Sequence, residues 1–158
     1  MSLVGEIARA YRAPRKVMQM QVDRGISEPQ TLFYGIFFGV MNLIANYPRV
    51  TVNAPDQDVL AGMMAGLFIA YIFFLPLMLY GFAGVLHWVI LKFGGQASWA
   101  EARRALNWSA VVTIPMILIS GSSYVFENNT LPMFFNVITA IIFLWQLWSN
   151  VTQVEFHS

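Results

Sequence analysis

The sequence predicts an all-α membrane protein, a polytopic bundle of transmembrane helices. Of its 158 residues, 58% are hydrophobic and only 11% are charged, whereas soluble domains carry roughly a quarter charged residues. So few charges cannot cover a water-facing surface of ordinary polarity, and lipid is the solvent that the excess apolar surface needs. Four long uncharged runs provide the spans, because about 20 apolar residues cross the hydrocarbon core as a helix.

The four predicted spans cover residues 31–48, 59–91, 99–126 and 131–153; the third helix is expected to begin on the cytoplasmic side, before its uncharged run, which starts at Ala105. The second run would be roughly 50 Å long as one helix. It contains Pro76 without polar turn residues beside it, which favours one kinked or tilted helix over two short spans, although a five-span protein remains the alternative. Gly94-Gly95 predicts the end of this helix, and Ser98 with Glu101 predicts a capping box for the next. Asn128-Asn129-Thr130 predicts the last turn.

Residues 1–30 predict a cytoplasmic segment with an amphipathic helix at the membrane interface, broken at Pro14. A weakly ordered tail is the alternative. The apolar face of this helix comprises Leu3, Ile7, Ala10, Tyr11, Val17, Met18 and Gln21. The transmembrane domain is expected over residues 31–154, followed by a cytoplasmic tail at 155–158.

The basic residues predict the orientation. Arg49 alone lies in the loop between the first two spans, and the short loop before the last span has Glu127 and no basic residue. The remaining Lys and Arg fall on the other side, which should therefore be cytoplasmic. Four spans place both termini there. The tryptophans are expected in an aromatic belt at the same interface, namely Trp88, Trp99, Trp108, Trp145 and Trp148.

No catalytic, cofactor-binding or metal-binding residue is predicted, so we do not expect an enzyme. Cysteine is absent and the two histidines are far apart in the sequence, which makes a poor metal site. His87 is the titratable side chain of the usual functional kinds within the apolar runs. We interpret it as an interfacial histidine that bonds to water or headgroups; a proton-linked or ligand-binding role is the alternative. The net charge of +1 gives no nucleic-acid footprint.

Two GxxxG patterns are candidate helix-packing faces, Gly35 with Gly39 and Gly62 with Gly66. They predict either packing within the bundle or docking of another subunit. Polar side chains in the spans predict interhelical hydrogen bonds or, alternatively, a narrow polar pathway; these are Asn42, Asn46, Ser120 and Ser122. Candidate headgroup or partner contacts are Arg9, Arg12, Arg15, Lys16, Lys92, Arg103 and Arg104.

The order of several motifs resembles the short bacterial members of the Yip1 family, particularly those of alphaproteobacteria. These motifs are Arg12-Ala13-Pro14-Arg15, Asn46-Tyr47-Pro48-Arg49, His87, Phe93-Gly94-Gly95, Ser98 to Arg103, Asn107-Trp108 and Pro115. The resemblance covers nearly the whole chain and implies an all-helical polytopic membrane protein. The family has no agreed catalytic residues, so none is carried over.

The expected function is that of a non-enzymatic membrane adaptor or accessory subunit in the bacterial inner membrane. Its partners would be the lipid bilayer and other membrane protein subunits, met through lateral helix packing and a basic cytoplasmic face. A small transporter or channel component is the alternative. It would need a polar route through the bundle.

Overall fold

The computed structural model describes residues 2–126 and 130–156, and all regular structure within them is helical. The elements are α1 (Leu3–Ala10), α2 (Pro14–Asp23), α3 (Glu28–Asn53), α4 (Gln57–Ile69), the π-helical turn η1 (Ala70–Phe74), α5 (Leu75–Leu91), α6 (Trp99–Val112), α7 (Ile114–Ser123) and α8 (Thr130–Phe156).

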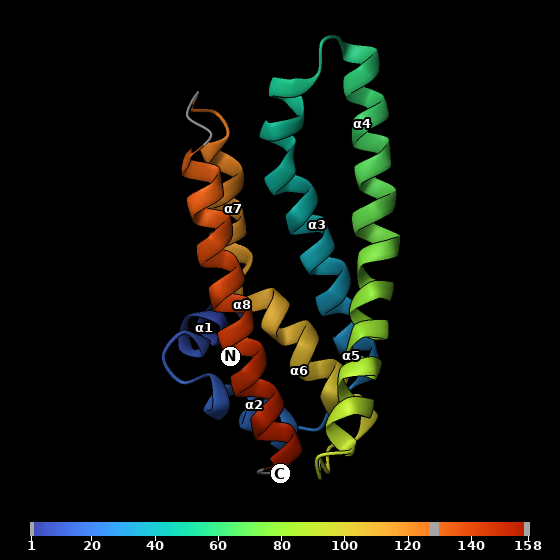
Figure 1. Ribbon diagram of the computed structural model, residues 1–158, viewed down its shortest axis with the longest axis vertical. Helices are drawn as coiled ribbons and strands as arrows, with labels where there is room; N and C mark the ends of the chain where they lie inside the picture. Colours follow the sequence, from blue (N-terminus) through green and yellow to red (C-terminus); the bar gives the residue numbers. More distant parts are fainter. Residues whose placement is uncertain (1, 127–129, 157–158) are drawn as a thin grey trace.

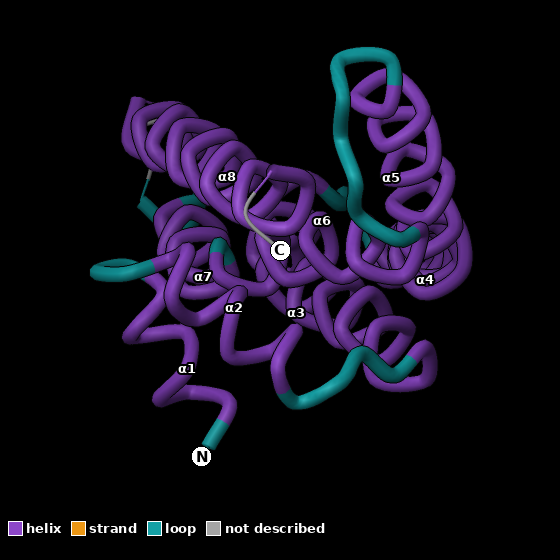
Figure 2. The backbone as a smooth tube through the Cα atoms, turned by 90° about the horizontal axis from the view of Figure 1, so that it is seen from below, coloured by secondary structure: helices purple, strands orange, loops and turns teal. Residues whose placement is uncertain are grey.

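Two antiparallel hairpins make the upper half of the molecule, α3 with α4 and α7 with α8 (Figure 1). In the lower half α6 crosses obliquely between α5 and α8, as the view from below shows (Figure 2). The short helices α1 and α2 lie beside the lower part of α8, where both ends of the chain are found. We call the lower part the terminal half and the upper part the hairpin half.

The run with Pro76 is one continuous helix from Gln57 to Leu91, which decides against the split into two spans. Its π-helical turn ends just before Pro76, and the Leu75 N–H bonds to the Ala70 carbonyl, five residues back. Proline has no N–H to donate within the helix. Prolines and single π turns inside an α-helix are both known causes of a local kink.

The expected third span is two helices rather than one. Helix α6 ends at Thr113, whose hydroxyl donates to the Ala110 carbonyl at 2.6 Å, and α7 begins with Ile114 and Pro115. Pro115 cannot donate to the preceding turn and favours the first turn of a new helix. Every residue from Arg104 to Val112 is buried, so α6 forms the core of the terminal half.

Local signals at the ends of these helices are confirmed. Ser98 and Glu101 make both hydrogen bonds of a capping box at the start of α6. Gly94 follows α5 with a φ of 88°, a left-handed conformation that only glycine adopts cheaply. The predicted turn at Asn128-Asn129 and the charge of Glu127 fall outside the described residues.

Helices α1 and α2 bury part of their apolar face against the bundle. Ala10, Val17 and Met18 are at most 2% exposed. The Tyr11 hydroxyl donates to the Val112 carbonyl at 2.8 Å, and burial raises the pKa of Tyr11. The predicted amphipathic face is thus packed in part against α6 and α8, and its position at the membrane interface stays a prediction.

Within residues 2–126 and 130–156, three helical segments are long and apolar enough to cross a membrane: Gln57–Leu91, Trp99–Ser123 and Thr130–Phe156. Helix α3 has 26 residues but is not among them, and it carries Asn42 and Asn46 along its apolar stretch. At the other end of the chain, α8 continues to Phe156. Residues 155 and 156, expected in a tail, are therefore helical.

Candidate functional site

A buried ion pair joins the last turns of α5 and α8. His87 Nδ1 lies 2.6 Å from Glu155 Oε1, and both side chains are at most 2% exposed. The histidine was expected at the interface in contact with water or headgroups, and the structure corrects this. Burying a charged or strongly polar group costs free energy unless a complementary group lies beside it. His87 and Glu155 are complementary partners for each other.

The same carboxylate holds the loop between α5 and α6. Its second oxygen accepts the Ala97 N–H at 3.2 Å, while the Glu155 backbone carbonyl accepts the Gln96 N–H at 3.0 Å. A Cβ on Gly95 would lie 2.5 Å from Glu155 Oε2, so glycine is needed for this close approach. The His87 ring meets the Trp99 ring edge to face at 4.6 Å. We name these residues the loop clamp: His87, Gly95, Gln96, Ala97, Trp99 and Glu155.

Sequence reasoning missed Glu155 because it was assigned to a tail just beyond the last apolar run. The position of Glu155 relative to the apolar residues of the last run could have indicated its burial. Glu155 follows Val151 by four residues, so the two share a helix face, and both are buried. Both ionisable side chains of the clamp, His87 and Glu155, are at most 2% exposed, and each contacts a different segment of the chain. Its chemistry is that of a structural tie.

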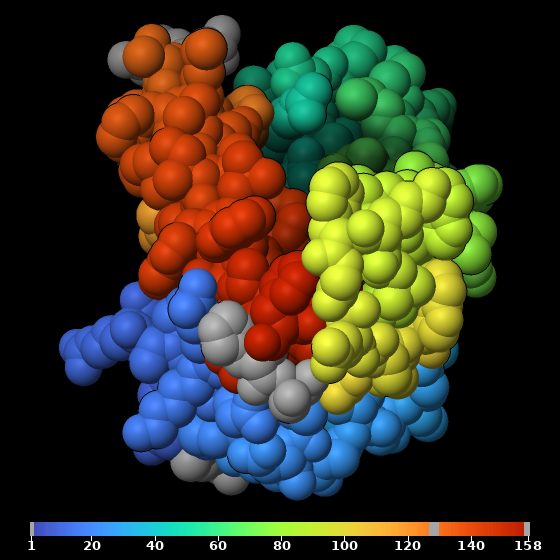
Figure 3. Space-filling model, turned by 60° about the horizontal axis from the view of Figure 1, so that its bottom comes forward, coloured from blue at the N-terminus to red at the C-terminus, as the bar shows by residue number. Residues whose placement is uncertain are grey.

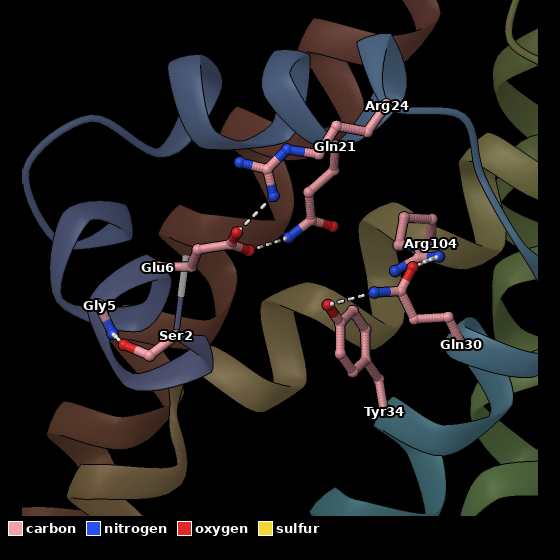
Figure 4. A network of polar contacts seen from close by, with 8 residues as sticks. All are labelled: Ser2, Gly5, Glu6, Gln21, Arg24, Gln30, Tyr34 and Arg104. Carbon is pink, nitrogen blue, oxygen red and sulfur yellow. Dashed lines mark hydrogen bonds and ion pairs between the residues drawn. The ribbon is translucent and has the colours of Figure 1, made fainter.

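A second polar cluster connects α1 with α2 (Figure 4). Glu6, only 6% exposed, accepts hydrogen bonds from Arg24 at 2.5 Å and from Gln21 at 3.5 Å. At the neighbouring end of α8, Gln146 donates to the Ala10 carbonyl at 2.8 Å. These bonds fix the two N-terminal helices to each other and to the bundle.

Arg104 was expected to contact headgroups, and the structure corrects this because the residue is 1% exposed. Its guanidinium donates to the Ser27 carbonyl at 3.1 Å and to Gln30 at 2.9 Å, and it lies over the Tyr34 ring at 4.9 Å (Figure 4). An arginine can satisfy several acceptors from one buried position. Arg104 therefore anchors the start of α3 to α6.

The other predicted basic contacts lie at the surface. Arg103 is partly buried, ion-paired with Glu28. The remaining ones are exposed: Arg9, Arg12, Arg15, Lys16 and Lys92. Lys92 lies 3.9 Å above the Trp88 ring. Figure 3 shows the N-terminal segment and the loop after α5 on the same face of the terminal half, on either side of the end of α8. This basic face is the surface available to anionic partners.

The two glycine pairs have different surroundings. A Cβ on Gly39 would lie 2.1 Å from the Tyr71 carbonyl, and one on Gly35 would meet Asn107 and Pro76. This pair lets α3 approach the long helix and α6. A Cβ on Gly62 or Gly66 would meet nothing within 4 Å, so the face of α4 with these glycines is open.

A groove of about 1120 Å³ lies in the hairpin half between α4 and α8. Asn46 donates to the Tyr71 hydroxyl at 3.1 Å, and Ser120 donates to Asn136 at 2.6 Å. Arg49 lies 5.9 Å from the Tyr124 ring centre near the hairpin tips. Asn46 and Asn136 both line the groove, whereas the Asn42 amide bonds back to its own helix at Phe38.

One predicted belt residue is in the core. Trp108 is 0% exposed, with its ring 5.4 Å from that of Tyr34. It was expected at the membrane interface, but its position on the buried face of α6 places it among core side chains. Trp88, Trp99, Trp145 and Trp148 are exposed, as an interfacial belt requires.

The model of the Yip1 domain matches residues 10–155. The chain belongs to the Yip1 family. This confirms the resemblance to the family; the bacterial subgroup stays a prediction. No curated protein and no solved structure matches the chain. In this Yip1-family chain the described residues contain no group of three or more His, Cys, Asp or Glu side chains that could hold a metal ion. The match and the apolar helices together establish a membrane protein.

Proposed function

We propose that this chain is a non-enzymatic integral membrane adaptor or accessory subunit of a larger membrane complex. The observation that carries the proposal is the exposure of α4. None of its residues from Gln57 to Ile69 is buried, and Gly62 and Gly66 leave room for another backbone to approach closely.

The open face continues along the same long helix. Phe73, Phe74, Leu77 and Met78 are 60–69% exposed. Lipid tails can cover these side chains, but a partner helix packs against small residues more closely than lipid does. The basic face of the terminal half would add electrostatic attraction to an acidic partner or an anionic leaflet.

We propose four spans in a bacterial cytoplasmic membrane, with α3 as the fourth and both termini in the cytoplasm. The chain has no cysteine, so single-cysteine variants test this cleanly. Arg12→Cys and Lys92→Cys should react with a membrane-impermeant maleimide only after the membrane is opened. Asn53→Cys, in the turn of the α3–α4 hairpin, should react in intact cells. Equal labelling of all three in intact cells would contradict the topology.

A small transporter component is the second candidate, and the groove in the hairpin half is the observation that favours it. The terminal half weighs against it. Leu106, Trp108 and Val111 are all 0% exposed and fill the bundle where a pathway would have to continue. The loop clamp also ties the last turns of α5 and α8 together through His87 and Glu155.

The adaptor proposal is tested by extraction from the source membrane in a polymer nanodisc, followed by native mass spectrometry. We expect a partner protein in fixed stoichiometry. We expect Gly62→Leu to remove the partner protein. Gly81→Leu is the control and should retain the partner: a Cβ on Gly81 also meets nothing within 4 Å, but Gly81 lies farther along the same helix. A lone chain in the native membrane extract would refute the adaptor role.

A further inference from the structure

We infer that the groove between α4 and α8 binds one phospholipid molecule, with the lipid phosphate at Arg49 and an acyl chain along the apolar wall. The inference does not rest on the adaptor proposal; the two share Gly66, but Gly62 does not line the groove and so distinguishes them. The groove is larger than the pockets of roughly 300–1,000 Å³ that hold most small ligands, since its volume is about 1120 Å³.

The groove is amphipathic along its length. Toward the hairpin tips it is lined by Arg49, Asn53 and Tyr124, and farther along α4 and α8 by Leu67, Val137 and Ala140. An occupant that matches both parts has a polar, negatively charged end and an apolar chain. A phospholipid is the abundant membrane component with that chemistry.

Arg49 is suited to bind the phosphate. It is exposed, and none of the ion pairs of the described residues uses it. Its contact with the Tyr124 ring orients the guanidinium without neutralising it. Arginine binds phosphate oxygens through two parallel, charge-assisted hydrogen bonds.

Polar groups deeper in the groove also call for a polar occupant. Asn136 is exposed on α8 and lies about 9 Å along the helix axis from its first residue. Asn46 and Tyr71 form a hydrogen-bonded pair on the opposite wall. Asn136 already accepts from Ser120, but its amide hydrogens and the hydroxyl hydrogen of Tyr71 can still donate to the glycerol and ester oxygens of a lipid.

Two glycines of α4 provide a matched pair of variants. Gly66 lines the groove and Gly62 does not, and a Cβ at either position meets no atom within 4 Å. Gly66→Leu should therefore fill the groove, and Gly62→Leu should leave it open. Because both glycines are exposed in the same helix, equal helical circular dichroism and equal thermal unfolding would show that both variants fold.

The experiment is native mass spectrometry of the full chain, reconstituted with phosphatidylglycerol and separately with diacylglycerol, after partial removal of lipid by detergent. We expect one tightly held phosphatidylglycerol on the wild type and on Gly62→Leu, and none on Gly66→Leu. Arg49→Gln should weaken phosphatidylglycerol retention by about tenfold and leave the weaker retention of diacylglycerol unchanged.

Four outcomes would overturn the inference: no retained phospholipid on the wild type; equal retention by Gly66→Leu; displacement of the lipid by inorganic phosphate alone, which would assign the site to a soluble anion; or a homodimer that only Gly66→Leu disrupts. Loss of the partner protein in Gly62→Leu with the lipid still bound would separate the two proposals.

Discussion

Replacement of His87 by Phe tests whether the loop clamp stabilises the terminal half through its polar contact. Phenylalanine keeps an aromatic ring edge against Trp99 but removes Nδ1, so Glu155 Oε1 loses its partner. The carboxylate would remain buried at 1% exposure. Its other oxygen still accepts the Ala97 N–H, which does not neutralise the charge.

The expected cost is large. The contact is short, at 2.6 Å, and both side chains are at most 2% exposed, so water cannot replace the lost partner. Removing one partner of a buried pair costs about 3–5 kcal/mol, because the remaining charge is uncompensated. We expect His87→Phe to lower the free energy of unfolding by that amount. Trp88→Phe, at an exposed neighbouring position, should change it by less than about 0.5 kcal/mol.

A second substitution should rescue the first. Glu155→Gln removes the charge but keeps an acceptor for the Ala97 N–H, and alone it should cost about 1 kcal/mol because its amide can donate to the other tautomer of His87. In the double variant no buried charge is left, so the cost should fall to about 1–2 kcal/mol. Reversible denaturation in mixed micelles, followed by circular dichroism, measures each free energy of unfolding.

A local readout distinguishes the clamp from general destabilisation. The amide protons of Gln96 and Ala97 are both bonded to Glu155, so hydrogen exchange at these two positions should speed up in His87→Phe more than exchange in α7. Additive costs in the double variant would refute the reasoning, since independent groups add and coupled ones do not. Unchanged exchange at both amides would refute it as well.

Three further predictions concern other contacts. Gly39→Ala should destabilise the protein by about 1–3 kcal/mol or more, because its Cβ would lie 2.1 Å from a backbone carbonyl; Gly62→Ala is the matched control, and equal thermal unfolding of the two would contradict this. Arg104→Met should cost about 2–3 kcal/mol in denaturation by leaving the Ser27 and Gln30 acceptors without their charged donor, and a neutral result would show that water replaces it. Tyr11 has a pKa raised above its ordinary value of 10.0, so its contribution to stability is complete below about pH 10 and is lost as the pH rises through the folded-state pKa. Tyr11→Phe should make stability fall less steeply above pH 10, and an unchanged slope would count against the buried hydroxyl.

The sequence predicted those features that depend on short-range chemistry. The capping box of Ser98 and Glu101, the left-handed Gly94 and the helical run across Pro76 all follow from residues within one or two helical turns. The family could also be recognised, because its motifs keep their order along the chain. Composition was sufficient for the membrane class, since a charge content of 11% cannot solvate an ordinary protein surface.

The features that were missed depend on contacts between distant segments. Arginine and tryptophan are both common at the membrane interface, so each of Arg104 and Trp108 alone favoured that position. Helix α6 has packing partners on several sides, however, and both side chains lie in the core. Similarly, Glu155 follows an apolar run and is polar, which favours a tail. The histidine that compensates for the burial of Glu155 lies at the end of α5, 68 residues earlier in the sequence.

The break at Thr113 explains why the two halves of the molecule differ. On one side of it, α6 packs against both α5 and α8, and α2 packs against α8. On the other side, α7 follows α3 so closely that a Cβ on Gly121 would lie 2.0 Å from the Ala45 carbonyl. That close approach leaves α4 and α8 as separate walls of the groove. Regions with few buried contacts open more easily than a packed core, so amides of α4 should exchange faster than those of α6, and the occupancy of the groove should slow that exchange.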